Sequence, residues 1–152
     1  MENNSTIQPL LPLGRVLSLT GKSFLHLLNN KLSYLDIERD YYALMLIELG
    51  DGYLTQKELA SHLGTDKVSV VRIVDYLTSK GYVERVESSV DRRKYCLTLT
   101  GKAKEMLPGI KKSMQEITAT AFEGLTGVQQ GEFISTLGQI KKNLSKAKTI
   151  GL

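Results

Sequence analysis

A short break between two helical segments constrains the fold of this chain more than any other feature. The break is the stretch HLGTD, residues 62–66, in which Gly64 ends one helix and Asp66 is a favourable N-cap for the next. The first helix starts at a capping-box pattern, Thr55 with Glu58 three residues later. The sequence therefore predicts two short helices joined by a tight, glycine-containing turn, which is a helix-turn-helix.

The second helix, predicted over residues 66–80, has two faces of different chemistry. Its apolar side chains recur three and four residues apart, as a buried stripe requires, at Val70, Ile73, Val74 and Leu77. The opposite face carries small or polar side chains and two long cations, at Lys67, Val68, Ser69, Val71, Arg72, Asp75 and Tyr76. A helix that enters the major groove of DNA needs such a face, because small side chains allow close approach and long ones reach base edges. Taken alone, the pattern also fits a solvated helix surface.

Several residues of this second face have a role if the helix binds DNA. Arg72 can donate two hydrogen bonds to a guanine. Lys67 and Ser69 lie near the helix N-terminus, where such helices meet bases or phosphates. Val68 and Val71, expected to be exposed, suit contacts with thymine methyl groups better than they suit exposure to water.

A predicted β-hairpin follows the two helices. Its strands are YVERVE, residues 82–87, and KYCLTL, residues 94–99. The tip holds the run Asp91-Arg92-Arg93-Lys94. Such a run alone is most often a solvated turn, but a hairpin directly after a helix-turn-helix makes a winged helix-turn-helix. Arg92, Arg93 and Lys94 then lie where a wing reaches flanking phosphates or a narrow, electronegative minor groove.

The rest of the chain is predicted to be helical. Amphipathic helices are expected over about residues 13–35, 38–49 and 100–122, the last with a kink at Pro108, and a final helix after Thr126, which forms a second capping-box pattern with Gln129. The fold class is therefore mainly α with a small β wing. The first and last helices both carry an apolar stripe, which indicates a homodimer.

Composition excludes several classes of function. The chain of 152 residues has a net charge of +4 and one cysteine, Cys96. No signal peptide or membrane span is visible, so a cytoplasmic protein is expected. His26 and His62 have no ligand at metal-binding spacing, and no catalytic set or phosphate-binding loop appears. We therefore expect no metal, no cofactor and no enzymatic activity.

Residues 59–103 resemble the MarR (multiple antibiotic resistance regulator) family of transcription factors. The matching features are the LxxxLG helix, the stretch VxRIVDxLxxKGYVER, the wing motif Asp91-x-Arg93, and Leu99-Thr100. By this resemblance Asp91 braces the wing and Arg93 enters the minor groove. The family usually has a glycine at the position of Ala103.

The resemblance implies how the whole chain is organised. Residues 1–152 would form one MarR-like domain, with a winged helix-turn-helix DNA-binding region at 36–100 and a helical dimerisation region at 11–35 and 101–148. The expected function is a dimeric, sequence-specific DNA-binding regulator, a repressor, of a pseudo-palindromic operator, with relief by a small-molecule effector left open. The alternative is a protein-interaction module that uses exposed Val68, Val71 and Tyr76 without binding DNA.

Two further features permit more than one interpretation. Four tyrosines near the first two helices, Tyr34, Tyr41, Tyr42 and Tyr53, can line a ligand pocket or belong to core and rim. Cys96 invites a redox role, as in some MarR relatives, but the chain has no second cysteine to resolve a sulfenic acid. Tyr95, Leu97 and Leu99 are expected to point inward and Cys96 outward on a half-covered strand.

Overall fold

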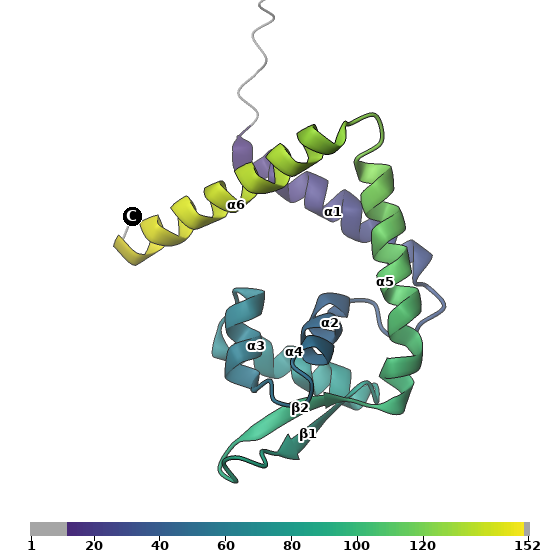
Figure 1. Ribbon diagram of the computed structural model, residues 1–152, viewed down its shortest axis with the longest axis vertical. Coiled ribbons are helices and arrows are strands. Elements are labelled where there is room, and N and C mark those ends of the chain that lie inside the picture. Colours follow the sequence, from purple (N-terminus) through teal and green to yellow (C-terminus); the bar gives the residue numbers. More distant parts are fainter. Residues whose placement is uncertain (1–11, 151–152) are drawn as a thin grey trace, which may run out of the picture. The chain divides into compact units, whose positions relative to one another are not determined.

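The computed structural model describes residues 12–150, so Leu11, where the predicted dimerisation region begins, lies outside the described part. The chain divides into a compact unit that ends at Ile117 and a second that begins at Thr118. Figure 1 shows the elements along the chain. In order they are α1 (Leu13–Lys31), α2 (Tyr41–Leu49), α3 (Gln56–Leu63), α4 (Lys67–Ser79), β1 (Val83–Glu87), β2 (Tyr95–Leu99), α5 (Gly101–Ala121) and α6 (Gly127–Ile150). The predicted class, mainly α with a small antiparallel β wing, is confirmed.

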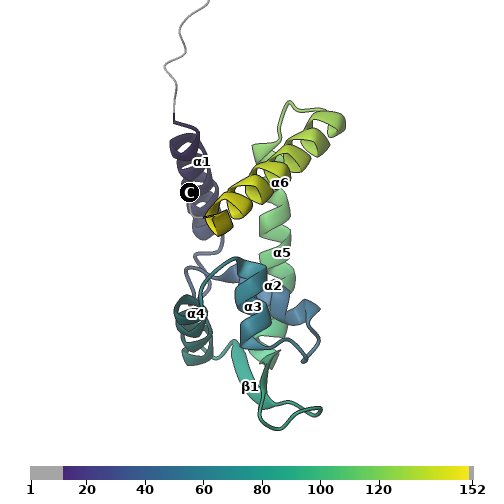
Figure 2. The same cartoon turned by 90° about the vertical axis from the view of Figure 1, so that its left-hand side faces the viewer.

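The helix-turn-helix forms through the local interactions that its sequence predicts. Thr55 Oγ1 accepts from Glu58 N, and Glu58 Oε2 accepts from Thr55 N at 2.8 Å, which completes the capping box of α3. Gly64 ends α3 with a φ of 64°, a left-handed conformation that glycine adopts without steric strain. Asp66 Oδ1 then accepts from Ser69 N at 2.8 Å and starts α4. Figure 2 shows α3 and α4 side by side above the hairpin.

The buried face of α4 attaches the helix to the core of the first unit. Val70, Val74 and Leu77 are at most 1% exposed, whereas Ile73, predicted in the same stripe, is half-buried. The same core takes Leu107 and Ile110 from α5, and Ala103 is fully buried where the family usually has glycine. The orientation of α4 is thereby fixed, and its opposite face is left toward solvent.

The hairpin is covered more than its alternating sequence predicts. Its register pairs Val83 with Leu99 and Arg85 with Leu97. The segment just before α3 pairs with β2, because Leu97 N donates to Leu54 O at 2.8 Å. This segment covers Cys96, which is only 4% exposed.

The predicted orientation of two β2 residues was therefore wrong. Tyr95 is 57% exposed rather than inward, and Cys96 is buried rather than outward. The Cys96 thiol donates to Tyr53 O at 3.4 Å. Burial under another segment removes the exposure that a redox-sensing thiol needs.

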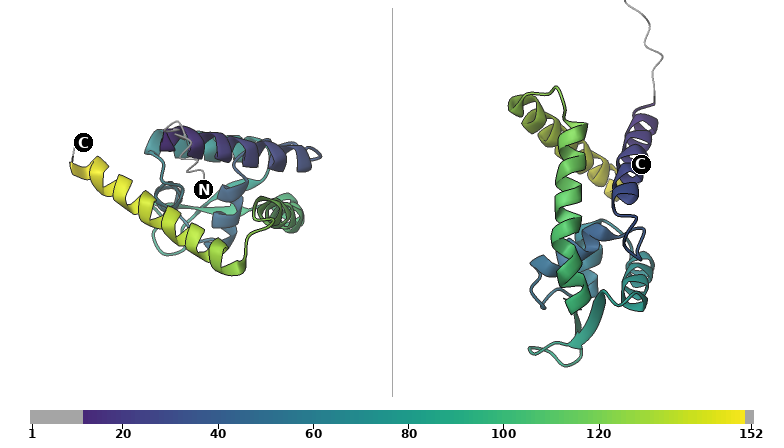
Figure 3. Two further views of the ribbon diagram at one scale, coloured as in Figure 1. Left: turned by 90° about the horizontal axis from the view of Figure 1, so that it is seen from above. Right: turned by 90° about the vertical axis from the view of Figure 1, so that its right-hand side faces the viewer.

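Two helix boundaries also differ from the predictions. α1 ends at Lys31 rather than near residue 35, because the chain turns there and buries Leu32 in the core. α2 begins at Tyr41 rather than at residue 38, because its N-cap Asp40 has a left-handed φ of 66°. α5 contains Pro108 and continues past it as one helix. Figure 3 shows α5 as one continuous green helix.

The second unit contains the end of α5 and all of α6. Thr126 N donates to Gln129 Oε1 and Gln129 N donates to Thr126 Oγ1, so the predicted second capping box is present. Phe122 and Phe133 meet edge to face with ring centroids 5.8 Å apart. No described side chain of α6 is buried, and Leu144 is 63% exposed. Among the described helices, none combines the length and hydropathy that a membrane crossing requires.

Candidate nucleic-acid interface

The outer face of α4 presents most of the side chains that the sequence assigned to DNA. Lys67 and Arg72 are exposed, and Val68 is 62% exposed. Val71, expected to be exposed, is instead half-buried. Ser69 is also half-buried, and its hydroxyl donates to Asp66 Oδ2 at 2.9 Å, so part of its hydrogen-bonding capacity serves the cap.

The N-terminus of α4 already holds an anion of its own. Hydrogen bonds from Ser69 hold the pKa of the Asp66 carboxyl below its usual range, so this cap is ionised at neutral pH. It occupies amide groups that could otherwise bind a phosphate. A phosphate near this end of α4 would therefore rely on Lys67.

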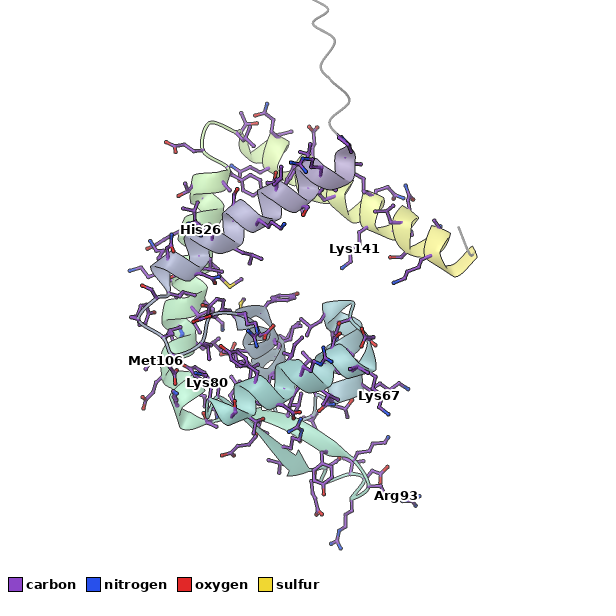
Figure 4. All side chains as sticks on the ribbon, turned by 180° about the vertical axis from the view of Figure 1, so that it is seen from behind. His26, Lys67, Lys80, Arg93, Met106 and Lys141 are labelled. Atoms are coloured by element: carbon purple, nitrogen blue, oxygen red, sulfur yellow. The ribbon has the colours of Figure 1, made fainter. Side chains whose placement is uncertain are left out.

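The hairpin tip is braced from within. Asp91 Oδ1 accepts from Arg93 N at 3.1 Å, Asp91 O accepts from Lys94 N at 2.9 Å, and Lys94 Nζ lies 3.8 Å from Asp91 Oδ2. Arg92 and Arg93 stay exposed, whereas the charge of Lys94 is partly compensated by Asp91. In Figure 4 Lys67 lies at one end of α4 and Arg93 at the hairpin tip, with both side chains directed outward and Lys80 at the far end of α4.

Arg85, which the sequence reasoning missed, ties the wing to both helices of the helix-turn-helix. From β1 its guanidinium donates to Asp75 Oδ1 on α4 at 2.6 Å and to Gln56 Oε1 on α3 at 3.3 Å. A single salt bridge on the surface contributes little stability. A guanidinium on β1 that bonds both α3 and α4 nevertheless restricts the relative positions of these three elements. The sequence offers one weak signal for this contact, an arginine within the first predicted strand after an acid on the predicted recognition helix.

The four tyrosines do not form one pocket. Tyr41 and Tyr42 line a cavity of about 300 Å³, whereas Tyr34 and Tyr53 do not line it and are 64% and 66% exposed. The other lining residues come from α1, α2, α3, α5 and the segment before α2: Leu25, Leu28, Asn29, Glu38, Arg39, Asp40, Ala43, Leu63 and Met114. Tyr41 is buried, and its hydroxyl donates to Ile37 O.

Asp40 brings a carboxyl group to this cavity, and the only salt bridge that it makes among the described residues is with its neighbour Arg39. Its Oδ2 is buried and accepts no hydrogen bond, although Arg39 Nε lies 3.4 Å away. Burial raises the pKa of the Asp40 carboxyl above its usual range, and the nearby Arg39 charge opposes this effect. The sequence pointed to Tyr41 and Tyr42 of this cavity but not to Asp40, because the cavity depends on the packing of distant helices.

No group of three or more metal-ligating side chains occurs among the described residues. Within the described part of the chain, His26 lies on α1, next to Asn30 Nδ2 at 3.1 Å from its Nε2, and His62 lies exposed on α3. The two histidines thus belong to separate local environments.

Two helices in a tight turn, followed by a braced hairpin, define this first unit as a winged helix-turn-helix. Residues 37–94 match the MarR family model. The multiple antibiotic resistance protein MarR of Salmonella typhimurium is 33% identical over 91 residues, which is 60% of this chain and 63% of that protein. The chain thus spans about 63% of the length of the curated relatives that it matches.

Solved structures extend the likeness to most of the chain. The crystal structure of a mutant MarR from E. coli complexed with operator DNA is 27% identical, with a TM-score of 0.76 over 86% of this chain and 94% of that one. A MarR transcriptional regulator from Methanosarcina mazei is also 27% identical, with a TM-score of 0.75 over 88% and 96%. Residues 37–94 thus match the MarR family, and most of the chain shares the fold of solved MarR-family regulators.

Proposed function

We propose that this chain is a dimeric, sequence-specific DNA-binding repressor that a small-molecule effector releases from its operator. One observation carries the proposal. The exposed face of α4, with Lys67, Val68 and Arg72, belongs to the same compact unit as a hairpin tip that presents Arg92 and Arg93. One duplex can therefore meet a helix suited to base edges and a cationic loop suited to its backbone.

The two cationic elements have different tasks in this proposal. Arg72 reads a guanine in the major groove, and Val68 contacts a thymine methyl group. Arg93 contacts phosphates or enters the minor groove, where its attraction depends on groove width and charge. The MarR of E. coli was crystallised with operator DNA, which supports the same kind of partner here.

Dimerisation is proposed from apolar side chains that remain uncovered in one chain. On α1, Leu13 is 57% and Leu25 is 55% exposed, and on α6 Phe133 is 46% and Leu144 is 63% exposed. Exposed apolar surface of this kind marks an interaction site. A two-fold dimer presents two copies of α4, so half-sites about 10 bp apart in a pseudo-palindrome are expected.

The alternative, a protein-interaction module, loses much of its expected surface. Of Val68, Val71 and Tyr76, only Val68 is exposed; the other two are half-buried. Tyr76 is also engaged, since its hydroxyl accepts from Glu38 N at 3.0 Å and its ring lies 4.1 Å from Arg39 Cζ. We therefore favour DNA as the partner.

The test compares three single alanine variants in binding to a selected operator, to a variant of its central bases and to a variant of its flanks. Arg72→Ala should weaken operator binding by about 1–3 kcal/mol per half-site and reduce base preference. Arg93→Ala should weaken binding to all duplexes and lower the slope of log affinity against log salt by about 0.9 per half-site. Lys80→Ala is the matched control, because Lys80 is an exposed cation at the far end of α4.

The outcomes separate the two functions. If Arg72→Ala and Lys80→Ala affect base preference equally, α4 does not read sequence. If the parent chain shows no salt-dependent affinity for duplex DNA, the proposal is wrong, because contacts to phosphates weaken steeply with salt whereas an apolar protein contact does not.

A further inference from the structure

We propose that the cavity beside Asp40 binds a protonated amine with an apolar body, with the Asp40 carboxylate as the anchor for the ammonium group. This inference rests on the proposed function and names the chemical class of the effector. It is carried by the chemistry of the cavity wall and by the contacts that join this wall to α4.

The cavity is apolar over most of its wall and charged at one end. Leu25, Leu28, Leu63 and Met114 come from three different helices, and Tyr41 adds a buried ring. A volume of about 300 Å³ lies at the lower end of the range of small-molecule sites. The charged end is the segment Glu38-Arg39-Asp40, directly before α2. A matching ligand therefore has a compact apolar body and one charged end.

The hydrogen bonding of Asp40 selects the sign of that charge. Asp40 Oδ2 is buried and accepts no hydrogen bond, and an ionised carboxylate in such a place lacks the donors that water would supply. An ammonium group supplies up to three N–H donors and a positive charge. A carboxylate ligand would meet two acidic side chains and only Arg39 as a cation.

Backbone geometry holds the Asp40 side chain at the cavity. Asp40 has a φ of 66° and a ψ of 20°, a left-handed conformation that non-glycine residues seldom adopt. Its side chain makes no capping hydrogen bond with α2, although it stands at the N-cap position. The carboxylate thus does not serve the helix, and among the described residues a ligand competes for it only with Arg39.

The segment that carries Asp40 also contacts the recognition helix. Glu38 N donates to the Tyr76 hydroxyl at 3.0 Å, and the Arg39 guanidinium lies over the Tyr76 ring at 4.1 Å. An ammonium group beside Asp40 competes with Arg39 for the carboxylate and repels the guanidinium. Arg39 then leaves its place over Tyr76, α4 loses this support, and affinity for the operator falls.

The experiment uses the full chain and two probes that differ in charge only at one group. 1-Naphthylmethylamine is protonated at pH 7, and 1-naphthylmethanol is its neutral counterpart. Calorimetry on the parent should give a dissociation constant at least about tenfold lower for the amine. Asp40→Asn should remove this preference while it keeps the affinity for the alcohol, since asparagine tolerates a left-handed φ. Glu84→Gln, which removes an exposed acid of β1 outside the cavity, is the matched control and should keep the preference.

Each result decides the proposal. Equal affinities of the parent for amine and alcohol, no binding of either probe, or a preference that survives Asp40→Asn would overturn it, and the parent comparison decides even if the variant does not fold. Operator affinity is measured beside it with and without the amine. A parent that binds DNA but shows no amine preference refutes this inference alone. Amine preference in a parent that binds no DNA refutes the proposed function alone.

Discussion

The two faces of α4 can be separated by making the same substitution on each. Val74 and Val68 lie six residues apart on one helix, and both lose the same two methyl groups on replacement by alanine. Val74 is completely buried in the core of the first unit, whereas Val68 is 62% exposed. Any difference between Val74→Ala and Val68→Ala therefore reflects their surroundings rather than the chemistry of the change.

The expected stability changes follow from this difference in burial. Val74→Ala loses about 1.6 kcal/mol of transfer free energy, at about 0.8 kcal/mol for each buried methyl, plus up to about 1 kcal/mol for the cavity left behind. The higher helix propensity of alanine returns about 0.5 kcal/mol. The net loss is about 2 kcal/mol, or about 4–8 °C in melting temperature for a chain of this size. Val68→Ala should be neutral or stabilising by up to about 0.5 kcal/mol.

The expected effects on DNA binding are reversed. Val68→Ala should weaken the operator complex by about 1 kcal/mol per half-site if the side chain packs on a thymine methyl group. Val74→Ala should leave the affinity of the folded protein within about twofold of the parent.

Urea denaturation and fluorescence anisotropy with labelled operator measure both effects. Both are recorded at one protein concentration, because dimer stability depends on concentration. The reasoning fails if Val68→Ala destabilises the fold as much as Val74→Ala, or if Val74→Ala weakens operator binding more than Val68→Ala at a temperature where both are folded.

Three further changes test other parts of the structure. Thr55→Ala removes the capping box of α3 and should lower the free energy of unfolding by about 1 kcal/mol in urea titrations. Hydrogen bonds from Lys102 and Tyr82 hold the pKa of Asp36 below its usual range in the folded state, so its contribution is present above its unfolded pKa and is lost as pH falls through the folded pKa. Asp36→Asn should therefore be less stable at pH 7 and show a flatter loss of stability between roughly pH 5 and pH 3, measured as the urea midpoint at each pH. Leu137→Glu in the apolar stripe of α6 should give a monomeric mass by light scattering at micromolar concentration, whereas Gln139→Glu, on the polar face, should remain dimeric.

The helix-turn-helix could be predicted from sequence because short-range interactions define it. The capping box of Thr55 and Glu58, the left-handed Gly64 and the Asp66 cap all join residues at most four positions apart. Each makes a local hydrogen bond or satisfies a local steric requirement that the sequence reveals directly. The buried stripe of α4 was predicted for the same reason, since its period belongs to the helix itself.

The errors arose where a distant segment changes the environment of a residue. Cys96 is buried because the chain near Leu54, more than forty residues earlier, pairs with β2. The alternating pattern of a strand does not reveal that a segment distant in sequence will pack over it. The prediction that four tyrosines share one pocket has the same weakness, because their proximity in sequence does not determine which cavity each one lines. Only Tyr41 and Tyr42 line the cavity beside Asp40.

The segment between α1 and α2 explains how a small cavity can influence a helix that does not line it. In the middle of this segment, Asp36 accepts hydrogen bonds from Tyr82 at 2.7 Å and from Lys102 at 2.6 Å, which attaches the segment to the start of the hairpin and to α5. Glu38 and Arg39 contact Tyr76 on α4, and Asp40 faces the cavity. Because Asp36 anchors the segment, a ligand that displaces Arg39 from Asp40 cannot be accommodated by a shift of the whole loop. The displacement must instead act on the contact with Tyr76, and so on α4, the helix that we propose reads the operator.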